Sequence, residues 1–461
     1  MKIRNLVGDR AFYRSMFSVM LPVLAQNIIT NFVNLLDNIM VGQVGTEPMS
    51  GVAIVNQLLF VFNLCAMSGV AGAGILTAQF YGKGDTEGLR FSFRMKLLIS
   101  LLNFGVFAGL FAFKGDALIS LFLHEGQEAL DLAATLEYGR AYLAVMLFQM
   151  LPFSLIQVYA GTLRETGETV LPMKAGILAV FVNLILNYIL IFGKLGAPAM
   201  GVTGAAAATV IARISEALVV IIATHRHGEK NQYIEGVYSS LYIPRPVMKK
   251  VAVMGLPLLL NELLWSGGMT VLSQCYSLRG LEAVSAVNIS VTVSQLFFCA
   301  YFAMGTTLSI MVGQLLGAGE LEKAVDTDRK LIAFSVALCI VVGAIMAVLA
   351  PFIPEMYNTT AAVRKLARNM IFVSAALMPV NAFTHNCYFT LRTGGKTAVT
   401  FIFDSLFVWA VNIPTALILS RLTDMAILPM YIIVQAQVII KASVGFMLVK
   451  SGKWVRTLVN D

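Results

Sequence analysis

Twelve apolar stretches of membrane-spanning length follow one another along this chain, and no other feature constrains its fold as strongly. A helix of about 20 apolar residues crosses the hydrocarbon core of a bilayer. Inside lipid, each backbone polar group needs a partner within the protein, which a helix supplies and an open strand does not. The chain is therefore predicted to be an all-α polytopic membrane protein, with spans near residues 15–41, 49–81, 97–113, 138–161, 175–192, 204–224, 251–276, 283–316, 331–352, 370–391, 398–420 and 427–449.

The composition agrees with lipid as the main solvent. Of the 461 residues, 58% are hydrophobic and only 13% are charged, and the mean hydropathy is +0.79. Soluble globular proteins are much less apolar. The formal net charge of +8 does not indicate nucleic-acid binding, because the basic residues lie singly or in small groups between apolar runs and form no basic face.

The distribution of Lys and Arg predicts the orientation. If the N-terminus lies in the cytoplasm, the segments on that side carry 23 of the 33 basic residues and the opposite loops carry 8. Such an excess is typical of cytoplasmic loops. We therefore expect both termini in the cytoplasm, in a multi-pass protein of a bacterial-type plasma (inner) membrane, surrounded by membrane lipid. The other two, Arg213 and Lys441, fall within predicted spans, and Arg213 is predicted to pair with Glu216, three residues later.

The longest hydrophilic stretch follows the sixth span. It runs from His225 to Lys250 and contains several charged residues and two prolines, a composition typical of a loop. We place a cytoplasmic linker at residues 226–250, between an N-terminal lobe at 1–225 and a C-terminal lobe at 251–461. Each lobe would hold six of the twelve spans.

The two lobes repeat each other in sequence. Because each has an even number of spans, both begin on the same side of the membrane, which makes them parallel repeats. Transporters that move two bundles about a central site use this arrangement; a duplicated scaffold without transport is the alternative. Three motifs recur in the same order. Leu21-Pro22 recurs as Leu256-Pro257, and Gln79-x-x-Gly82-x-Gly84 recurs as Gln314-x-x-Gly317-x-Gly319, both with an offset of 235 residues. Leu163-Arg164 recurs as Leu391-Arg392, with an offset of 228 residues.

These motifs resemble those of the multidrug and toxic compound extrusion (MATE) family. The similarity extends to Asp37 and Gly42 at the end of the first span and to Asn183 and Asn187 in the fifth. The resemblance implies twelve helices in two six-helix lobes arranged as a V. It also implies a secondary active antiporter that exports amphipathic, often cationic organic compounds such as drugs, by alternating access of the lobes, in exchange for H⁺ or Na⁺.

Asp37 is the first acidic residue within a span, and no basic residue lies between Arg14 and Lys83. An ionisable side chain in hydrocarbon is costly, so it usually marks a cavity, a partner or an ion path. Without a nearby basic residue, the Asp37 carboxyl is expected to be either protonated or bound to a cation. The alternative is that Asp37 lies near its helix end and reaches the outer water.

The resemblance places a cation-coupling site around Asp37. It implies that Asn183 and Asn187 of the fifth span and Thr209 of the sixth join the carboxylate, with Na⁺ as the metal. Asn183 and Asn187 are four residues apart and share one helix face. Some relatives have a second Asp where this chain has Asn187, so a proton site with two carboxylates is excluded here. The alternative is that these three side chains only hold helices together.

Polar residues in the second lobe are candidates for the lining of a substrate cavity. By resemblance, Glu262 matches a helix-seven Glu of the family approximately, and Asn381 stands where some relatives have an acid. Asp404 and Lys441 are predicted to form a pair, which lowers the burial cost of each charge. A structural role is the alternative for each. The full set of candidates is Asn261, Glu262, Asn381, Asp404 and Lys441.

No enzyme motif is present in the sequence. Gly395, Lys396 and Thr397 lack the spacing of a phosphate-binding loop because position 390 is Thr, and neither a metal-ligand spacing nor a nucleophile motif occurs. The five cysteines all lie in apolar stretches, which argues against a disulfide framework. We expect a monomer that is not an enzyme, has no cofactor besides the coupling ion, and takes a small organic substrate.

Two other functions stay open. The same fold serves carriers of lipid-linked or polysaccharide precursors, so a flippase or exporter of this kind is the first alternative. Such anionic cargo favours a cavity rich in Arg and Lys, whereas the sequence offers few basic residues to the spans. A membrane enzyme or receptor is the second alternative, which the absence of a sizeable extramembrane domain disfavours.

Overall fold

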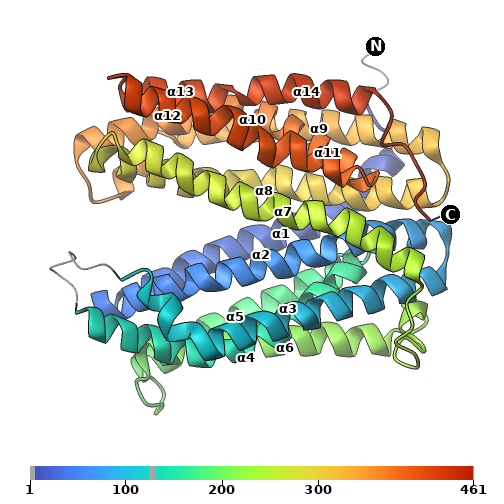
Figure 1. The fold of residues 1–461 in the computed structure, drawn as a ribbon, viewed down its shortest axis with the longest axis horizontal. Helices are drawn as coiled ribbons and strands as arrows, with labels where there is room; N and C mark the ends of the chain where they lie inside the picture. Colours follow the sequence, from blue (N-terminus) through green and yellow to red (C-terminus); the bar gives the residue numbers. More distant parts are fainter. Residues whose placement is uncertain (1–5, 124–130, 460–461) are drawn as a thin grey trace. The chain divides into compact units, whose positions relative to one another are not determined.

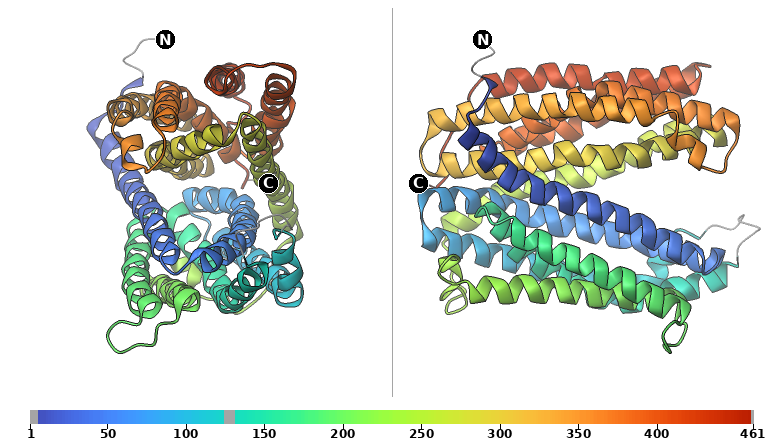
Figure 2. Two further views of the ribbon diagram at one scale, coloured as in Figure 1. Left: turned by 90° about the vertical axis from the view of Figure 1, so that its left-hand side faces the viewer. Right: turned by 180° about the vertical axis from the view of Figure 1, so that it is seen from behind.

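The computed structural model describes residues 6–123 and 131–459, and every regular element in these ranges is helical. Figure 1 shows the long helices and Figure 2 shows them from two further sides. The first ten are α1 (Arg10–Gly42), α2 (Thr46–Lys83), α3 (Thr86–Ser120), α4 (Leu132–Glu165), α5 (Val170–Phe192), α6 (Gly201–Arg226), α7 (Arg245–Ser277), α8 (Leu281–Gly317), α9 (Leu321–Leu349) and α10 (Ala361–Thr393).

The last two predicted spans are composite. The eleventh consists of α11 (Thr397–Phe401), the π-helices η4 (Ile402–Leu406) and η5 (Val408–Asn412), and α12 (Ile413–Leu422). The twelfth is divided into α13 (Ile427–Ala436) and α14 (Val438–Lys450). Two short 3₁₀ turns, η2 (Gln232–Ile234) and η3 (Ile353–Met356), lie between the long helices.

Each of the twelve predicted spans coincides with a helical segment, so the all-α membrane fold is confirmed. Eleven helices of the described residues are long and apolar enough to cross a bilayer. The exception, α7, is as long as its neighbours but begins with Arg245 and also carries Lys249, Lys250 and Glu262. Its polar residues therefore lower its hydropathy without shortening the helix.

Several helices extend well beyond the predicted spans. For example, α3 begins at Thr86, where the Asp85 carboxylate caps the helix by accepting a hydrogen bond from the Gly88 N–H at 2.8 Å. The predicted span at 97–113 ends where charged residues begin, although a helix tolerates charges near its ends. One expectation is consequently wrong: Arg213 and Lys441 are not the only basic residues in the spans, because Lys96 lies within α3 and is fully buried.

The chain folds into two compact units. The N-terminal unit comprises Ala25–Thr77 and Asp85–Ala252, and its core lies where α3, α4 and α6 meet α2. The C-terminal unit comprises Met1–Leu24, Ala78–Gly84 and Val253–Asp461, and α8, α9 and α10 pack together at its centre. Apolar side chains such as Phe62 in the first unit and Leu308 in the second are fully buried there.

The repeated glycine motifs meet inside the C-terminal unit. A Cβ atom at Gly82, near the end of α2, would overlap the Gln314 carbonyl on α8, and a Cβ at Gly317 would overlap the Gln79 carbonyl on α2. The Gln79 side chain also donates to the Thr393 carbonyl at 3.3 Å and accepts from the Leu458 N–H at 2.7 Å. The motif therefore has glycine at 82 and 317 because the two helix backbones approach each other too closely for any side chain.

Candidate cation and substrate sites

The N-terminal unit brings Asp37, Asn183, Asn187 and Thr209 together. Asn187 donates from Nδ2 to Asp37 Oδ1 at 2.7 Å and to Asn183 Oδ1 at 3.2 Å. The Asn183 amide lies 3.2 Å from the Thr209 hydroxyl, which itself donates to the Ala205 carbonyl at 3.0 Å. Side chains from α1, α5 and α6 thus form one connected polar group around a single carboxylate.

The Asn183 amide has two orientations with different consequences. In one, its Oδ1 accepts from Asn187, and its Nδ2 donates to Thr209. In the other, its Nδ2 donates to both Asp37 oxygens, at 2.9 and 3.0 Å, and its Oδ1 accepts from the Thr209 hydroxyl. Which end of an amide is oxygen is assigned from its hydrogen-bond partners. Only the second orientation adds a donor from Asn183 to the one that Asn187 gives the carboxylate.

No basic side chain of residues 6–123 and 131–459 forms an ion pair with Asp37. Arg213 on α6 interacts with it electrostatically, but the Arg213 guanidinium pairs with Glu216, at 2.8 Å between Nη1 and Oε2. The pairing that the sequence predicted for Arg213 is therefore present. Asp37 is left with amide donors as its direct neighbours.

The C-terminal unit joins three of the candidate cavity residues. Asp404 lies in the π-helix η4 and forms an ion pair with Lys441 of α14, at 2.5 Å between Oδ1 and Nζ. Asn261 of α7 donates from its side-chain amide to the other Asp404 oxygen at 3.0 Å. The backbone carbonyl oxygen and the side-chain oxygen of Asn261 both accept from the Ser405 hydroxyl. The predicted pair is present, with α7 holding the π-helix beside it.

The other two candidates in this unit differ in how they are connected to this group. Glu262 is half-buried on α7, shares a side-chain hydrogen bond with Asn261, and interacts electrostatically with Arg392 and Asp404. Asn381 lies on α10, where its backbone carbonyl accepts from the Thr384 hydroxyl at 2.9 Å. No hydrogen bond in the described part of the chain joins Asn381 to the Asp404 group.

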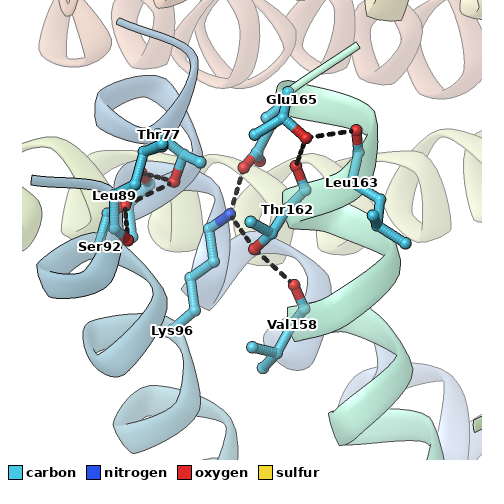
Figure 3. A network of polar contacts seen from close by, with 10 residues as sticks. Thr77, Leu89, Ser92, Lys96, Val158, Thr162, Leu163 and Glu165 are labelled. Atoms are coloured by element: carbon cyan, nitrogen blue, oxygen red, sulfur yellow. Dashed lines mark hydrogen bonds and ion pairs between the residues drawn. The ribbon is translucent and has the colours of Figure 1, made fainter. Parts of the chain in front are cut away.

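Sequence reasoning missed a buried charge pair in the N-terminal unit (Figure 3). The Lys96 ammonium forms an ion pair with the Glu165 carboxylate and donates to the Thr162 hydroxyl at 3.0 Å. The pair joins α3 to α4, and Lys96 has no exposed side-chain surface. Because both residues stand near the ends of apolar runs, hydropathy predicts loops at their positions.

A buried acid in the C-terminal unit was missed for the same reason. Asp328 of α9 accepts a hydrogen bond from the Thr390 hydroxyl of α10 at 2.6 Å, and both residues are fully buried. The repeat contains a signal for one member of the pair, Thr390. At the offset of 228 that relates Leu163 to Leu391, Thr390 corresponds to Thr162, which contacts Lys96 in the other half.

Comparison with known proteins places this arrangement in a family. The family model MatE matches residues 22–189 and 257–418. A probable multidrug resistance protein NorM from Thermotoga maritima is 24% identical over 447 residues, covering 97% of this chain and 94% of that protein. A probable multidrug resistance protein, YoeA, from Bacillus subtilis is 23% identical over 432 residues, covering 91% and 89% of the two chains.

Solved structures show the same fold. An outward-facing multidrug resistance MATE family transporter of the MOP superfamily superposes with a TM-score of 0.85, at 19% identity, over 98% of this chain and 97% of that one. A MOP superfamily transporter from Pyrococcus furiosus, described by the reverse polarity of its binding pocket, gives a TM-score of 0.83 at 20% identity, with the same coverage. The family match spans both halves of the repeat, and the chain therefore belongs to the MatE family, the multidrug and toxic compound extrusion transporters.

Proposed function

We propose that this chain is a secondary active antiporter that exports amphipathic organic cations, such as drugs and toxic metabolites, in exchange for Na⁺ or H⁺. Family membership and relatives named as multidrug resistance proteins support the export of small organic compounds. We place the protein in a bacterial-type inner membrane as a monomer, with both termini in the cytoplasm. The excess of Lys and Arg in alternate loops supports this orientation.

The observation that carries the coupling proposal is the Asp37 carboxylate, which is surrounded by amides and has no ion-pair partner among the described residues. A carboxylate within a membrane span is costly unless a cation or a proton neutralises it. Because Asn187 contributes no second carboxylate, the group carries a single negative charge. One monovalent cation balances that charge.

The Asn183 amide can respond to the cation. With its nitrogen toward Asp37, it donates to both oxygens of the bare carboxylate. With its oxygen there, that oxygen lies 2.9 and 3.0 Å from the two Asp37 carboxylate oxygens, which is favourable only when a cation or a proton lies among them. Rotation of this amide would therefore accompany ion binding and release, and would alter the contacts among α1, α5 and α6.

Ion binding then biases transport through the equilibrium between conformations. A cation that binds one conformation of the lobes more tightly shifts the population toward it, and an organic cation that prefers the other conformation is released. In the C-terminal unit, we assign the substrate contacts to Asn261, Glu262, Asn381, Asp404 and Lys441. The acids Glu262 and Asp404 would attract a cationic substrate, and Lys441 keeps Asp404 neutralised until it arrives.

The test is efflux from proteoliposomes, with a fluorescent organic cation inside and with Na⁺ and pH gradients imposed separately. We expect one of the two gradients to drive efflux by the wild-type protein, and Asp37→Asn to abolish the gradient-driven part. The matched control is Asp116→Asn, which removes an exposed acid on α3. Unchanged gradient-driven efflux in Asp37→Asn would remove Asp37 as the coupling residue, and absence of efflux under both gradients would remove the antiport proposal.

A further inference from the structure

The C-terminal unit contains a buried carboxylate whose charge is balanced by no basic side chain of the residues that the structure describes. Asp328 of α9 has no exposed surface. Its Oδ1 accepts from the Thr390 hydroxyl at 2.6 Å, whereas its Oδ2 is buried without a hydrogen-bond partner in the described residues. A buried carboxylate with half of its acceptor capacity unused is unfavourable unless another group binds there.

The charged groups near Asp328 do not neutralise it. Arg329 interacts with it electrostatically, but Arg329 is exposed and forms no ion pair with it among the described residues. Lys330 is engaged with Asp326, at 2.5 Å. The Cys387 thiol of α10 also interacts electrostatically with Asp328 and carries no positive charge. Within residues 6–123 and 131–459, no Lys, Arg or His forms an ion pair with Asp328.

A second buried oxygen at the same helix contact has no partner either. Asn386 lies one turn before Thr390 on α10 and is fully buried. Its Nδ2 donates to the Ser335 hydroxyl at 2.8 Å and to the Ala382 carbonyl at 2.6 Å, while its Oδ1 has no partner among the described residues. Ser335 stands two turns after Asp328 on α9. The α9–α10 contact thus holds a carboxylate oxygen and an amide oxygen that both need a donor or a cation.

The repeat indicates that a cation, and not a hydrogen-bond donor, is the missing partner of these oxygens. In the first half, the Thr162 hydroxyl contacts the Lys96 ammonium between α3 and α4 (Figure 3). Thr390 corresponds to Thr162 at the offset of 228, and the offset of 235 between α3 and α9 places Leu331 opposite Lys96. Asp328 lies one helical turn from Leu331 on the same face. The first half therefore has its own cation beside the repeated threonine, and the second half has an anion there.

We propose that the α9–α10 contact binds a sodium ion through Oδ2 of Asp328 and Oδ1 of Asn386, at the place where the first half carries the Lys96 ammonium. Carboxylate, amide and hydroxyl oxygens are ligands for hard cations. A single carboxylate matches an ion with one positive charge. The described residues contain no group of three or more His, Cys, Asp or Glu that could hold a metal ion, so the oxygens of Asp328 and Asn386 suit sodium better than a metal that needs several such ligands. The site is separate from Asp37 and does not depend on the proposed coupling there.

Sodium binding to the purified full-length protein tests the proposal. Thermal unfolding in detergent is compared in NaCl and in choline chloride at equal ionic strength, at pH 8, and bound radioactive Na⁺ is counted. The background is Asp37→Asn, which removes the other predicted site. We expect this protein to bind one Na⁺ and to gain melting temperature in a saturable way. Adding Asp328→Asn should abolish both effects, whereas the control Asp326→Asn, an acid on the same helix, should change neither.

A second variant keeps the test valid if Asp328→Asn fails to fold. Leu331→Lys, again with Asp37→Asn, supplies an ammonium at the position that corresponds to Lys96, within reach of Asp328. This variant should fold without sodium, bind none, and show the same melting temperature in both salts. Sodium binding that persists in Leu331→Lys or Asp328→Asn, or its absence from Asp37→Asn, would overturn the proposal. Failure of coupling at Asp37 would instead appear as unchanged efflux in the single variant Asp37→Asn.

Discussion

At the scale of single residues, Lys96 is a costly side chain to place in this fold. Its ammonium lies in the interior of the N-terminal unit, where Glu165 and Thr162 are its partners. Removing two charges from water costs several kcal/mol each, which their attraction recovers only with good geometry. A protein with two apolar residues of similar volume at these positions would be about as stable. The Lys96–Glu165 pair therefore indicates how α3 and α4 are arranged and says little about stability.

Breaking the pair on one side should destabilise the protein. In Lys96→Met, the Glu165 carboxylate loses its ammonium partner, and we expect a loss of about 3 kcal/mol, the lower end for a buried pair because Glu165 is 22% exposed. A lower melting temperature in detergent reports this loss. The double variant Lys96→Met/Glu165→Gln should recover most of it, since no unbalanced charge remains.

The control for this pair is an exposed ion pair at the start of α9. Lys323 and Glu320 form an ion pair with 66% and 48% of their side chains exposed. Lys323→Met should change stability by less than about 1 kcal/mol. Equal melting temperatures for Lys96→Met and Lys323→Met would show that the Lys96–Glu165 ion pair is not buried in the protein in its membrane environment.

The sequence identified some of these residues and not others, for physical reasons. Asp37 and the two asparagines are visible because each is a polar interruption of a long apolar run. Lys96 and Asp328 are not visible in this way, because they stand at the edges of such runs, where a charge usually marks the end of a span. Which charges near a helix end reach water depends on the packing of neighbouring helices, and single-chain hydropathy does not contain that information.

At the scale of helices, the eleventh span shows what hydropathy leaves out. Its apolar run predicts a continuous helix, but η4 and η5 are π-helices, in which each turn contains an extra residue. Asn261 accepts from the Ser405 N–H at 3.3 Å within η4. A side chain from α7 therefore supports the altered helix next to the Asp404–Lys441 pair, and this support is a tertiary contact that the sequence of the span cannot reveal.

The close approach of α2 and α8 gives a prediction at the same scale. In Gly317→Ala, the new methyl group would overlap the Gln79 carbonyl, so the helix ends must separate, and we expect a loss of about 1–3 kcal/mol. The measurement is the melting temperature in detergent. The matched control is Gly109→Ala on α3, where a Cβ has no neighbour within 4 Å; this change should be neutral or stabilising by up to about 1 kcal/mol. Equal stability of the two variants would contradict the close contact.

At the scale of the whole chain, the two halves share their order of helices and differ in their buried charges. The N-terminal unit contains Asp37 and the Lys96 pair, and the C-terminal unit contains Asp328 and the Asp404 pair. The number and type of spans were predictable, because lipid requires long apolar helices. The partner of each charge was not predictable, because it depends on contacts between residues that are far apart in the sequence.

The orientation in the membrane can be tested on the full-length chain. Leu278 lies between α7 and α8 with 56% of its surface exposed, and Ser240 is exposed in the linker. A membrane-impermeant maleimide should label Leu278→Cys in intact cells and Ser240→Cys only after permeabilisation. The wild type serves as the baseline, because four of its five cysteines are buried. The reverse labelling pattern would place the linker and both termini outside the cytoplasm.

The crossing of the two glycine motifs has a consequence for how this protein can be divided. Gly82 lies against the Gln314 backbone, and Gly317 lies against the Gln79 backbone. Such reciprocal contacts are what identical subunits form about a two-fold axis. A single six-helix ancestor would have met a second copy of itself through this surface, and fusion would have turned a dimer contact into an internal one. A chain cut within residues 226–250 should then behave as an obligate heterodimer, in which each piece lacks the surface that the other supplies.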